Sequence, residues 1–128
     1  EWLHVWQLNI ALAERLAQAL DIGRPTLHSS QMNVPGDGSD LILNLCRTLG
    51  ASRYLTGHGA RNYLDHAAFD RCGIEVLYLD YDLSPYPQPH GVFDPFVTVL
   101  DVLEHAANPA KHIDARLVPW RQFTAQAA

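Results

Sequence analysis

The sequence has little positive charge and no long apolar run. Lys111 is the only lysine among 128 residues, and no run of Lys and Arg occurs. A nucleic-acid-binding surface needs such a basic patch, so we expect no nucleic-acid partner. No apolar stretch approaches the roughly 20 residues that cross a bilayer, and no signal peptide is visible. We therefore expect no membrane span and a cytoplasmic location.

Cysteine is also scarce. Cys46 and Cys72 are the only two, and both fall within segments that read as helices. We expect both to be small buried core residues in a reducing compartment. A disulfide between them stays open, because no spacing signature argues for it.

Signatures of metal sites and of hydrolases are missing. Neither His58 with His66 nor His105 with His112 has the i, i+4 spacing that places two ligands on one helix face. We therefore expect no metal. No Gly-x-Ser-x-Gly elbow is present, so a serine nucleophile is not expected. Nothing in the sequence indicates which cofactor, if any, is used.

The composition is that of a globular protein. About half of the residues are apolar, 48%, and charged residues make up 18%, with a formal net charge of −5. This length suits one domain, and no repeat or linker is visible. We expect a single α/β domain over residues 1–128. The chain begins at Glu1 rather than at a methionine, and we interpret it as a fragment or a processed chain.

Hydrophobic periodicity predicts alternating strands and helices. A 60–71 helix is expected to break near Asp65, prolines forbid regular structure after Tyr81, and the tail beyond Leu117 has no clear pattern. Strand–helix–strand order implies right-handed βαβ units, hence an α/β fold with a small parallel sheet of about three strands and helices packed on it. The expected strands cover residues 26–29, 53–55 and 74–80; the expected helices cover residues 2–20, 39–49, 60–71 and 94–105, with a last one from Asn108–Pro109.

A glycine turn inside residues 53–65 organises these predictions. The expected strand ends at Gly57-His58-Gly59, and a helix is expected to follow. Unpaired N–H groups and the dipole at a helix start attract anions, and Arg61 could add a bidentate contact to a phosphate or carboxylate. The alternative is that the two glycines only permit positive φ in a tight connection.

The carboxyl ends of parallel strands meet at one edge of a sheet, where ligands gather. Here those ends lead into Ser29 and Ser30, into the glycine turn, and into the proline-rich loop after Tyr81. We expect these polar segments to converge on one site.

Several stretches of the chain match one known family. They include Leu27-His-Ser-Ser30, Leu45-Cys-Arg-Thr-Leu-Gly-Ala51, Tyr54-Leu-Thr-Gly-His-Gly-Ala-Arg-Asn-Tyr-Leu-Asp65, Tyr86-Pro-Gln88, Gly91-Val-Phe93 and Val97-Thr-Val-Leu-Asp101. Through these stretches the sequence resembles the WbqC-like family of bacterial proteins over nearly all of residues 2–105. The Tyr-Leu-Thr-Gly-x-Gly block joined to the Tyr-Pro-Gln block is specific for it. Thr56, His66 and Glu104-His-Ala-Ala107 depart from the family pattern.

The resemblance implies a role in bacterial surface polysaccharide (O-antigen) biosynthesis. It also implies that the chain corresponds to the carboxyl-terminal half of a family member, because nothing here matches the family's amino-terminal motifs. That half, or a second copy of the chain, would then be a partner. An apolar patch on the 2–20 helix is expected at their contact, with Trp2, Leu3 and Trp6 as candidates.

Two residues are candidates for acid–base work. His58 lies between two glycines and could act as a general acid or base, or it is a solvent-facing turn residue. Asp65 could hold a sugar hydroxyl or serve as a helix cap, and Asp101 is expected to anchor the proline loop through backbone N–H groups. Candidate ligand-binding residues are Ser29, Ser30, Gly57, Gly59, Arg61, Tyr63, Tyr86, Gln88 and Gly91.

Two functions fit these residues. The first is a transferase that uses a phosphate-bearing sugar or acyl donor, with the Tyr86 loop covering the acceptor. Aromatic rings beside the Gln88 amide suit a sugar or a base, although Tyr86 and Phe93 could simply fasten the loop. The second is a non-catalytic ligand-binding or scaffolding module of a polysaccharide assembly system. Either way, a phosphorylated or sugar-type small molecule is the expected ligand.

Overall fold

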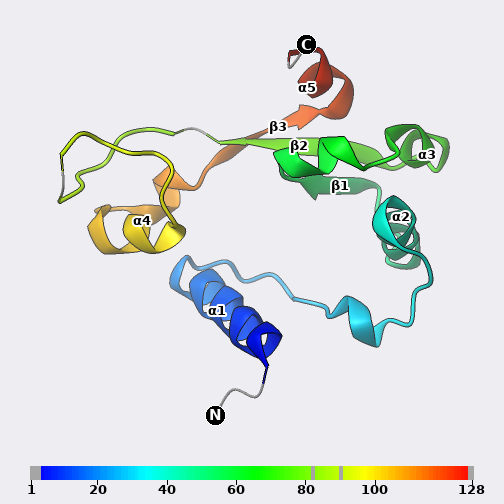
Figure 1. The fold of residues 1–128 in the computed structure, drawn as a ribbon, viewed down its shortest axis with the longest axis horizontal. Helices are drawn as coiled ribbons and strands as arrows, with labels where there is room; N and C mark the ends of the chain where they lie inside the picture. Colours follow the sequence, from blue (N-terminus) through cyan, green and yellow to red (C-terminus); the bar gives the residue numbers. More distant parts are fainter. Residues whose placement is uncertain (1–3, 82, 90, 127–128) are drawn as a thin grey trace. The chain divides into compact units, whose positions relative to one another are not determined.

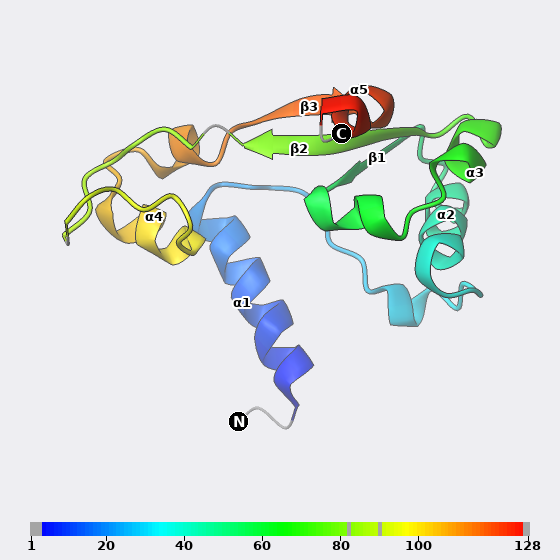
Figure 2. The same cartoon turned by 45° about the horizontal axis from the view of Figure 1, so that its top comes forward.

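The computed structural model describes residues 4–81, 83–89 and 91–126, in which helices and strands alternate (Figures 1 and 2). The strands are β1 (Arg53–Thr56), β2 (Glu75–Tyr81) and β3 (Ala115–Pro119); the α-helices are α1 (Val5–Ala19), α2 (Gly38–Thr48), α3 (His66–Arg71), α4 (Val99–His105) and α5 (Trp120–Gln126); the 3-10 helices are η1 (Ser29–Gln31), η2 (His58–Asn62) and η3 (Pro109–His112).

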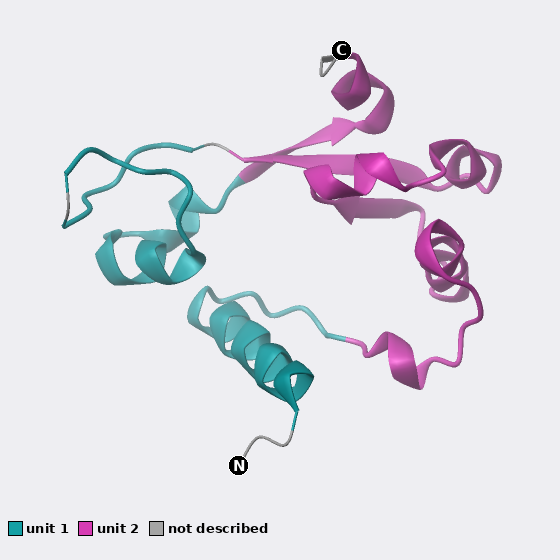
Figure 3. Cartoon of the chain, in the orientation of Figure 1, with its two compact units in different colours: residues 1–26, 83–114 teal, residues 27–82, 115–128 magenta. Residues whose placement is uncertain are grey.

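The chain divides into two compact units (Figure 3). Unit 1 comprises residues 1–26 and 83–114, and unit 2 comprises residues 27–82 and 115–128. Unit 2 holds the whole sheet, whereas unit 1 is built from α1, α4, η3 and the proline-rich loop. The expected single domain over 1–128 stays a prediction.

The sheet has three strands in the order β1-β2-β3. β1 and β2 are parallel, as predicted, with Thr56 opposite Tyr78. The expected strand over residues 26–29 was predicted wrongly, because these residues form no strand and lead into η1. Its place is taken by β3, which pairs antiparallel with β2 and places Val118 opposite Tyr78. The α/β class with about three strands is confirmed.

Unit 2 has its core on one face of this sheet. Phe69, Val76 and Tyr78 are fully buried, and Leu64 also faces inward, as predicted. Side chains alternate along a strand, so Leu55 and Leu77 point to the opposite face, where Leu77 is buried and Leu55 remains 47% exposed. The buried members of the core are Leu43, Cys46, Ala60, Leu64, Phe69, Ile74, Val76 and Tyr78.

The expected 60–71 helix is interrupted at Asp65, as predicted. Asp65 accepts a hydrogen bond from the backbone N–H of Ala68 at 3.1 Å and so caps α3. Its own N–H donates to the hydroxyl of Ser39 at 2.9 Å. The segment is therefore split into η2 and α3, and the exposed Cys72 follows α3. The prediction that Cys72 is buried was wrong, because it lies at the end of a short helix.

Unit 1 has a smaller core of Tyr86, Val102 and Ala106. α4 begins at Val99, capped by the Thr98 hydroxyl, and not at the predicted residue 94.

α1 begins at Val5 and ends at Ala19, and none of its residues is buried. Of the three residues expected to form an exposed apolar patch, Trp6 is 57% exposed. Trp2 and Leu3 lie outside the described residues. Within the described part of the chain, no helix has the length and apolarity needed to cross a membrane.

Candidate functional site

The glycine turn follows β1 directly. Gly57 caps η2 with a φ of −86°, and η2 is a 3-10 helix of five residues. The expected contribution of a long helix dipole is therefore wrong, because five residues align too few peptide dipoles. The anion site itself stays a prediction. The alternative explanation was also wrong, since neither Gly57 nor Gly59 adopts a positive φ.

These two glycines are not needed by the fold. A Cβ added at Gly57 or at Gly59 would meet no atom within 4 Å. A glycine that neither backbone conformation nor packing requires leaves open space in which a ligand can approach the backbone. The turn keeps this feature even though its helix is short.

His58 is held by two contacts within unit 2. Its Nε2 lies 3.0 Å from the carbonyl oxygen of Leu79, so that nitrogen carries the proton and donates. Its ring lies 4.8 Å from the ring of Phe123 in α5. The side chain thus links the turn to β2 and α5. Its predicted acid–base role stays a prediction, and only Nδ1 is left for it.

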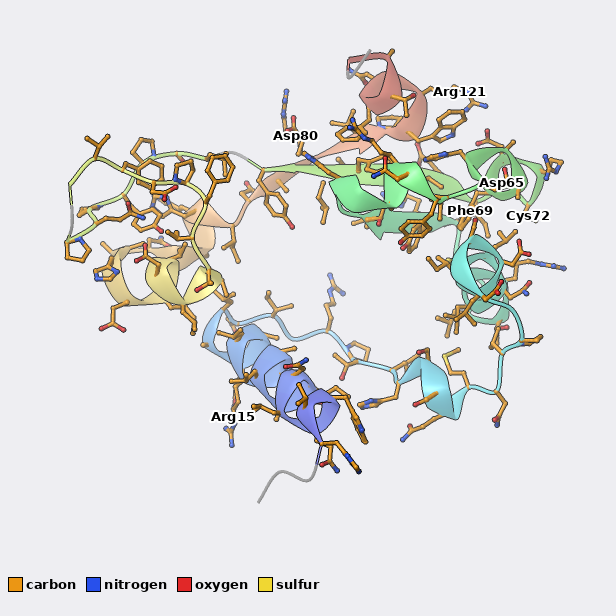
Figure 4. The ribbon with its side chains drawn as sticks, in the orientation of Figure 1. Arg15, Asp65, Phe69, Cys72, Asp80 and Arg121 are labelled. Carbon is orange, nitrogen blue, oxygen red and sulfur yellow. The ribbon has the colours of Figure 1, made fainter. Side chains whose placement is uncertain are left out.

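Asp65 has a structural position. Besides capping α3, its carboxylate lies 3.8 Å from the guanidinium of Arg71. Figure 4 shows Asp65 at the start of α3. The helix-cap alternative accounts for this residue, and its catalytic role is a prediction without geometric support.

Arg61 and Tyr63 lie on the outer side of the same turn. Both are exposed, and Tyr63 is 55% accessible. Within the described residues, Arg61 makes no hydrogen bond or ion pair. An exposed, unpaired guanidinium beside two open glycines can bind a phosphate or carboxylate bidentately.

Sequence reasoning missed a hydrogen-bonded pair that joins the half-buried His66 to the buried Tyr78. His66 Nε2 lies 2.8 Å from the Tyr78 hydroxyl, and its ring stacks on Trp120 at 4.7 Å. Burial raises the pKa of Tyr78, so the phenol stays protonated. Burial also lowers the pKa of His66, despite the nearby carboxylates of Asp70 and Asp65. The signal was His66 itself, which departs from the pattern of the family that the sequence resembles.

The lowered pKa of His66 predicts acid sensitivity. Unfolded His66 has a pKa of about 6.5, so below that pH the unfolded chain binds more protons than the folded one. Stability should therefore fall as the pH drops through about 6.5 and level off below the folded pKa. Urea unfolding at pH 7.5 and pH 5 would measure this, with His66→Gln as the control. An equal loss of stability in both proteins would contradict the assignment to His66.

In unit 1, the predicted residues of the proline loop form a hydrogen-bonded lock. The Tyr86 hydroxyl donates to Asp101 Oδ2 at 2.6 Å, and the Gln88 amide donates to the same oxygen at 2.9 Å. The Gln88 amide also brackets the backbone of Asp94, with contacts of 2.8 and 3.0 Å. Asp101 therefore anchors the loop, as predicted, but through side chains rather than through backbone N–H groups.

The charge of Asp101 holds this lock together. The hydrogen bonds from Tyr86 and then Gln88 lower the pKa of Asp101. Burial, followed by the hydrogen bond to Asp101, raises the pKa of Tyr86. His105 Nδ1 adds a contact of 3.3 Å to Asp101 Oδ1. The Tyr86 ring packs edge-on against Phe93 at 5.3 Å, so the loop-fastening alternative accounts for it.

The remaining predicted residues are more peripheral. Gly91 has a φ of +70°, a backbone conformation that favours glycine. The backbone conformation therefore accounts for a glycine at this position. Ser29 and Ser30 are exposed in η1 and do not follow a strand. We expected these serines to lie near the glycine turn because a strand at residues 26–29 would lead to the same sheet edge. Since no strand forms there, that reason no longer applies.

Two clefts among the described residues lie away from the predicted site residues. One of about 370 Å³ is bordered in unit 2 by Asp70, Gly73–Val76 and Pro119–Arg121. Another of about 310 Å³ lies in unit 1 between the end of α1 and residues 21–26. No predicted site residue borders either cleft. Among the described residues, no three His, Cys, Asp or Glu side chains gather as metal ligands would.

Comparison with known proteins identifies the family to which the chain belongs. The WbqC-like protein family matches residues 1–113. Because this match begins at residue 1, the prediction of a carboxyl-terminal half is not borne out. An uncharacterized protein of Mycobacterium tuberculosis is 33% identical over 97 residues, which cover 75% of this chain and 42% of that protein. The chain thus spans less than half of that relative's length. No solved structure matches.

Proposed function

Because the chain belongs to the WbqC-like protein family, we propose that it serves bacterial surface polysaccharide biosynthesis as a cytoplasmic ligand-binding module. Its ligand is a phosphate-bearing sugar or a similar donor, and the binding surface is the outer side of the glycine turn. Arg61 contacts the phosphate, Tyr63 flanks it, and the open backbone at Gly57 and Gly59 lets it approach.

One observation supports this proposal most. Gly57 and Gly59 occur where neither φ nor packing calls for glycine, and an unpaired, exposed arginine follows within η2. The structure favours binding over catalysis, because His58 and Asp65 are already engaged in contacts that stabilise unit 2. A transferase reaction would need acid–base groups that face a ligand.

Removing the guanidinium should weaken phosphate binding. We expect Arg61→Ala to weaken binding of inorganic phosphate or a nucleotide sugar by about tenfold or more, because a charge-assisted bidentate contact is lost. Isothermal titration calorimetry would measure it. The matched control is Arg47→Ala, which removes an exposed arginine from α2 and should leave binding unchanged.

Replacing Gly57 and Gly59 tests the proposed binding surface independently of Arg61. Gly57→Ala combined with Gly59→Ala should leave the melting temperature nearly unchanged, since both added methyl groups meet open space. The same variant should lose ligand binding, because the methyl groups keep the ligand from the backbone. Full binding by this variant, or equal losses in Arg61→Ala and Arg47→Ala, would refute the proposed surface.

A further inference from the structure

α5 packs on β2 and β3, and one of its rings contacts His58 of the glycine turn. It has seven residues, and it follows the region that matches the family, which ends at residue 113. Phe123 lies face to face with Tyr78, with ring centres 4.2 Å apart and planes within 7°. The same ring lies 4.8 Å from His58. An aromatic ring from the last helix thus fills a slot that β2 and the turn form.

Among the described side chains of α5, the polar attachments to the rest of unit 2 lie at its first turn. Asp70 accepts from the Trp120 indole at 3.3 Å and from Arg121 at 2.6 Å, and His66 stacks on Trp120. The Arg121 guanidinium also lies 4.5 Å from the centre of the Trp120 ring, and Figure 4 shows the Arg121 side chain extending from α5. Arg121 is largely exposed, and exposed ion pairs hold weakly. Among the described side chains beyond Arg121, Phe123 holds α5 by packing against the core and stacking on Tyr78. Because these contacts are apolar and α5 has only seven residues, the helix can lift locally without unfolding of the sheet.

The slot that Phe123 fills has the features of a site for a planar ring. Its floor is the face of Tyr78, whose hydroxyl is already paired with His66, and His58 forms a side wall. Arg61 follows His58 by three residues in the 3-10 helix η2, and residues three apart lie above one another in such a helix. The guanidinium can therefore reach a phosphate joined to a ring that lies beside His58. Bases stack on aromatic side chains in this way.

We infer that α5 is a lid and that Phe123 occupies the position of a nucleobase between Tyr78 and His58. When the lid lifts, the base of a nucleotide takes the slot, and Arg61 holds its phosphate. This inference rests on the proposed function for the phosphate contact, and it narrows the ligand to a nucleotide or nucleotide sugar.

The test compares two phosphates that differ in the base. UMP carries a base, and ribose 5-phosphate does not. We expect Phe123→Ala to bind UMP about tenfold more tightly than the wild type, because base stacking no longer competes with the lid. Binding of ribose 5-phosphate should not change. Gln122→Ala, an exposed position on the same helix, is the control and should match the wild type.

Failure of this inference is distinguishable from failure of the proposed function. Unchanged UMP affinity in Phe123→Ala, or an equal gain for both phosphates, overturns the lid even if Arg61→Ala abolishes phosphate binding. Tight UMP binding that survives Phe123→Ala combined with Arg61→Ala would support the slot and refute the phosphate contact. Hydrogen exchange gives a ligand-free readout: α5 amides should exchange at least about tenfold faster than β2 amides, and equal protection would contradict lifting.

Discussion

Phe69→Ala should unfold unit 2 at moderate temperature. Phe69 is fully buried in the core and stacks on Tyr54 at 5.6 Å. Removing a buried phenyl group costs about 3–5 kcal/mol, through lost transfer free energy and the cavity left behind. Domains of this size have a total stability of about 5–15 kcal/mol. The melting temperature should therefore fall by about 12 °C or more, as measured by circular dichroism.

Cys72→Ala is the matched control for this prediction. Cys72 follows the same helix but is exposed, so its replacement should change the free energy of unfolding by no more than about 0.5 kcal/mol. A similar drop in melting temperature for both variants would show that α3 as a whole, and not the buried ring, supports unit 2.

Asp101→Ala should release the proline loop of unit 1. The substitution removes the acceptor of the Tyr86 hydroxyl and of the Gln88 amide, and partly buried donors left without partners destabilise the folded loop. We expect amide hydrogen exchange in residues 83–89 and 91–98 to rise by about tenfold or more. Glu104→Ala, an exposed substitution on the same helix, should leave the exchange unchanged.

The hydrogen bonds to Asp101 should also make the stability of the proline loop in unit 1 depend on pH. The pKa of Asp101 is lowered in the folded state, so its contribution to stability is fully present above the unfolded pKa of about 3.9 and is lost as the pH falls further. In the wild type, protection of the loop should decline as the pH falls below about 4. In Asp101→Ala the loop should be open already at neutral pH. A loop that stays protected in that variant would show that the packing of Tyr86 against Phe93 holds it alone.

The predicted site consists of two parts, which belong to different units of the chain. The glycine turn and its histidine belong to unit 2, and the Tyr86 loop belongs to unit 1. The first part has an open surface with an unpaired arginine, which suits a ligand. The second part has its polar side chains paired with one another, which suits a structural role. Sequence reasoning had assigned both to ligand binding, because a motif does not show which of its side chains are already paired.

The sequence by itself determined the family and the central part of the sheet. Leu64 and Phe69 were placed inward from helical periodicity, and β2 was predicted from alternation, because local spacing decides which face of a short element is apolar. Asp65 was expected to interrupt the helix, and it caps α3. Even the turn at Gly57 was located correctly, since two glycines after a strand indicate a change of direction.

Only the tertiary structure decided what these segments contact. β3 has no clear pattern of its own, and it becomes a strand because the edge of β2 offers backbone partners for Val118 and its neighbours. Strand formation depends on such distant partners more than on intrinsic preference. The pairing of His66 with Tyr78 and the stacking of Phe123 on Tyr78 join residues far apart in sequence. Contacts of this kind leave no local periodicity, so no reading of the chain alone could have found them.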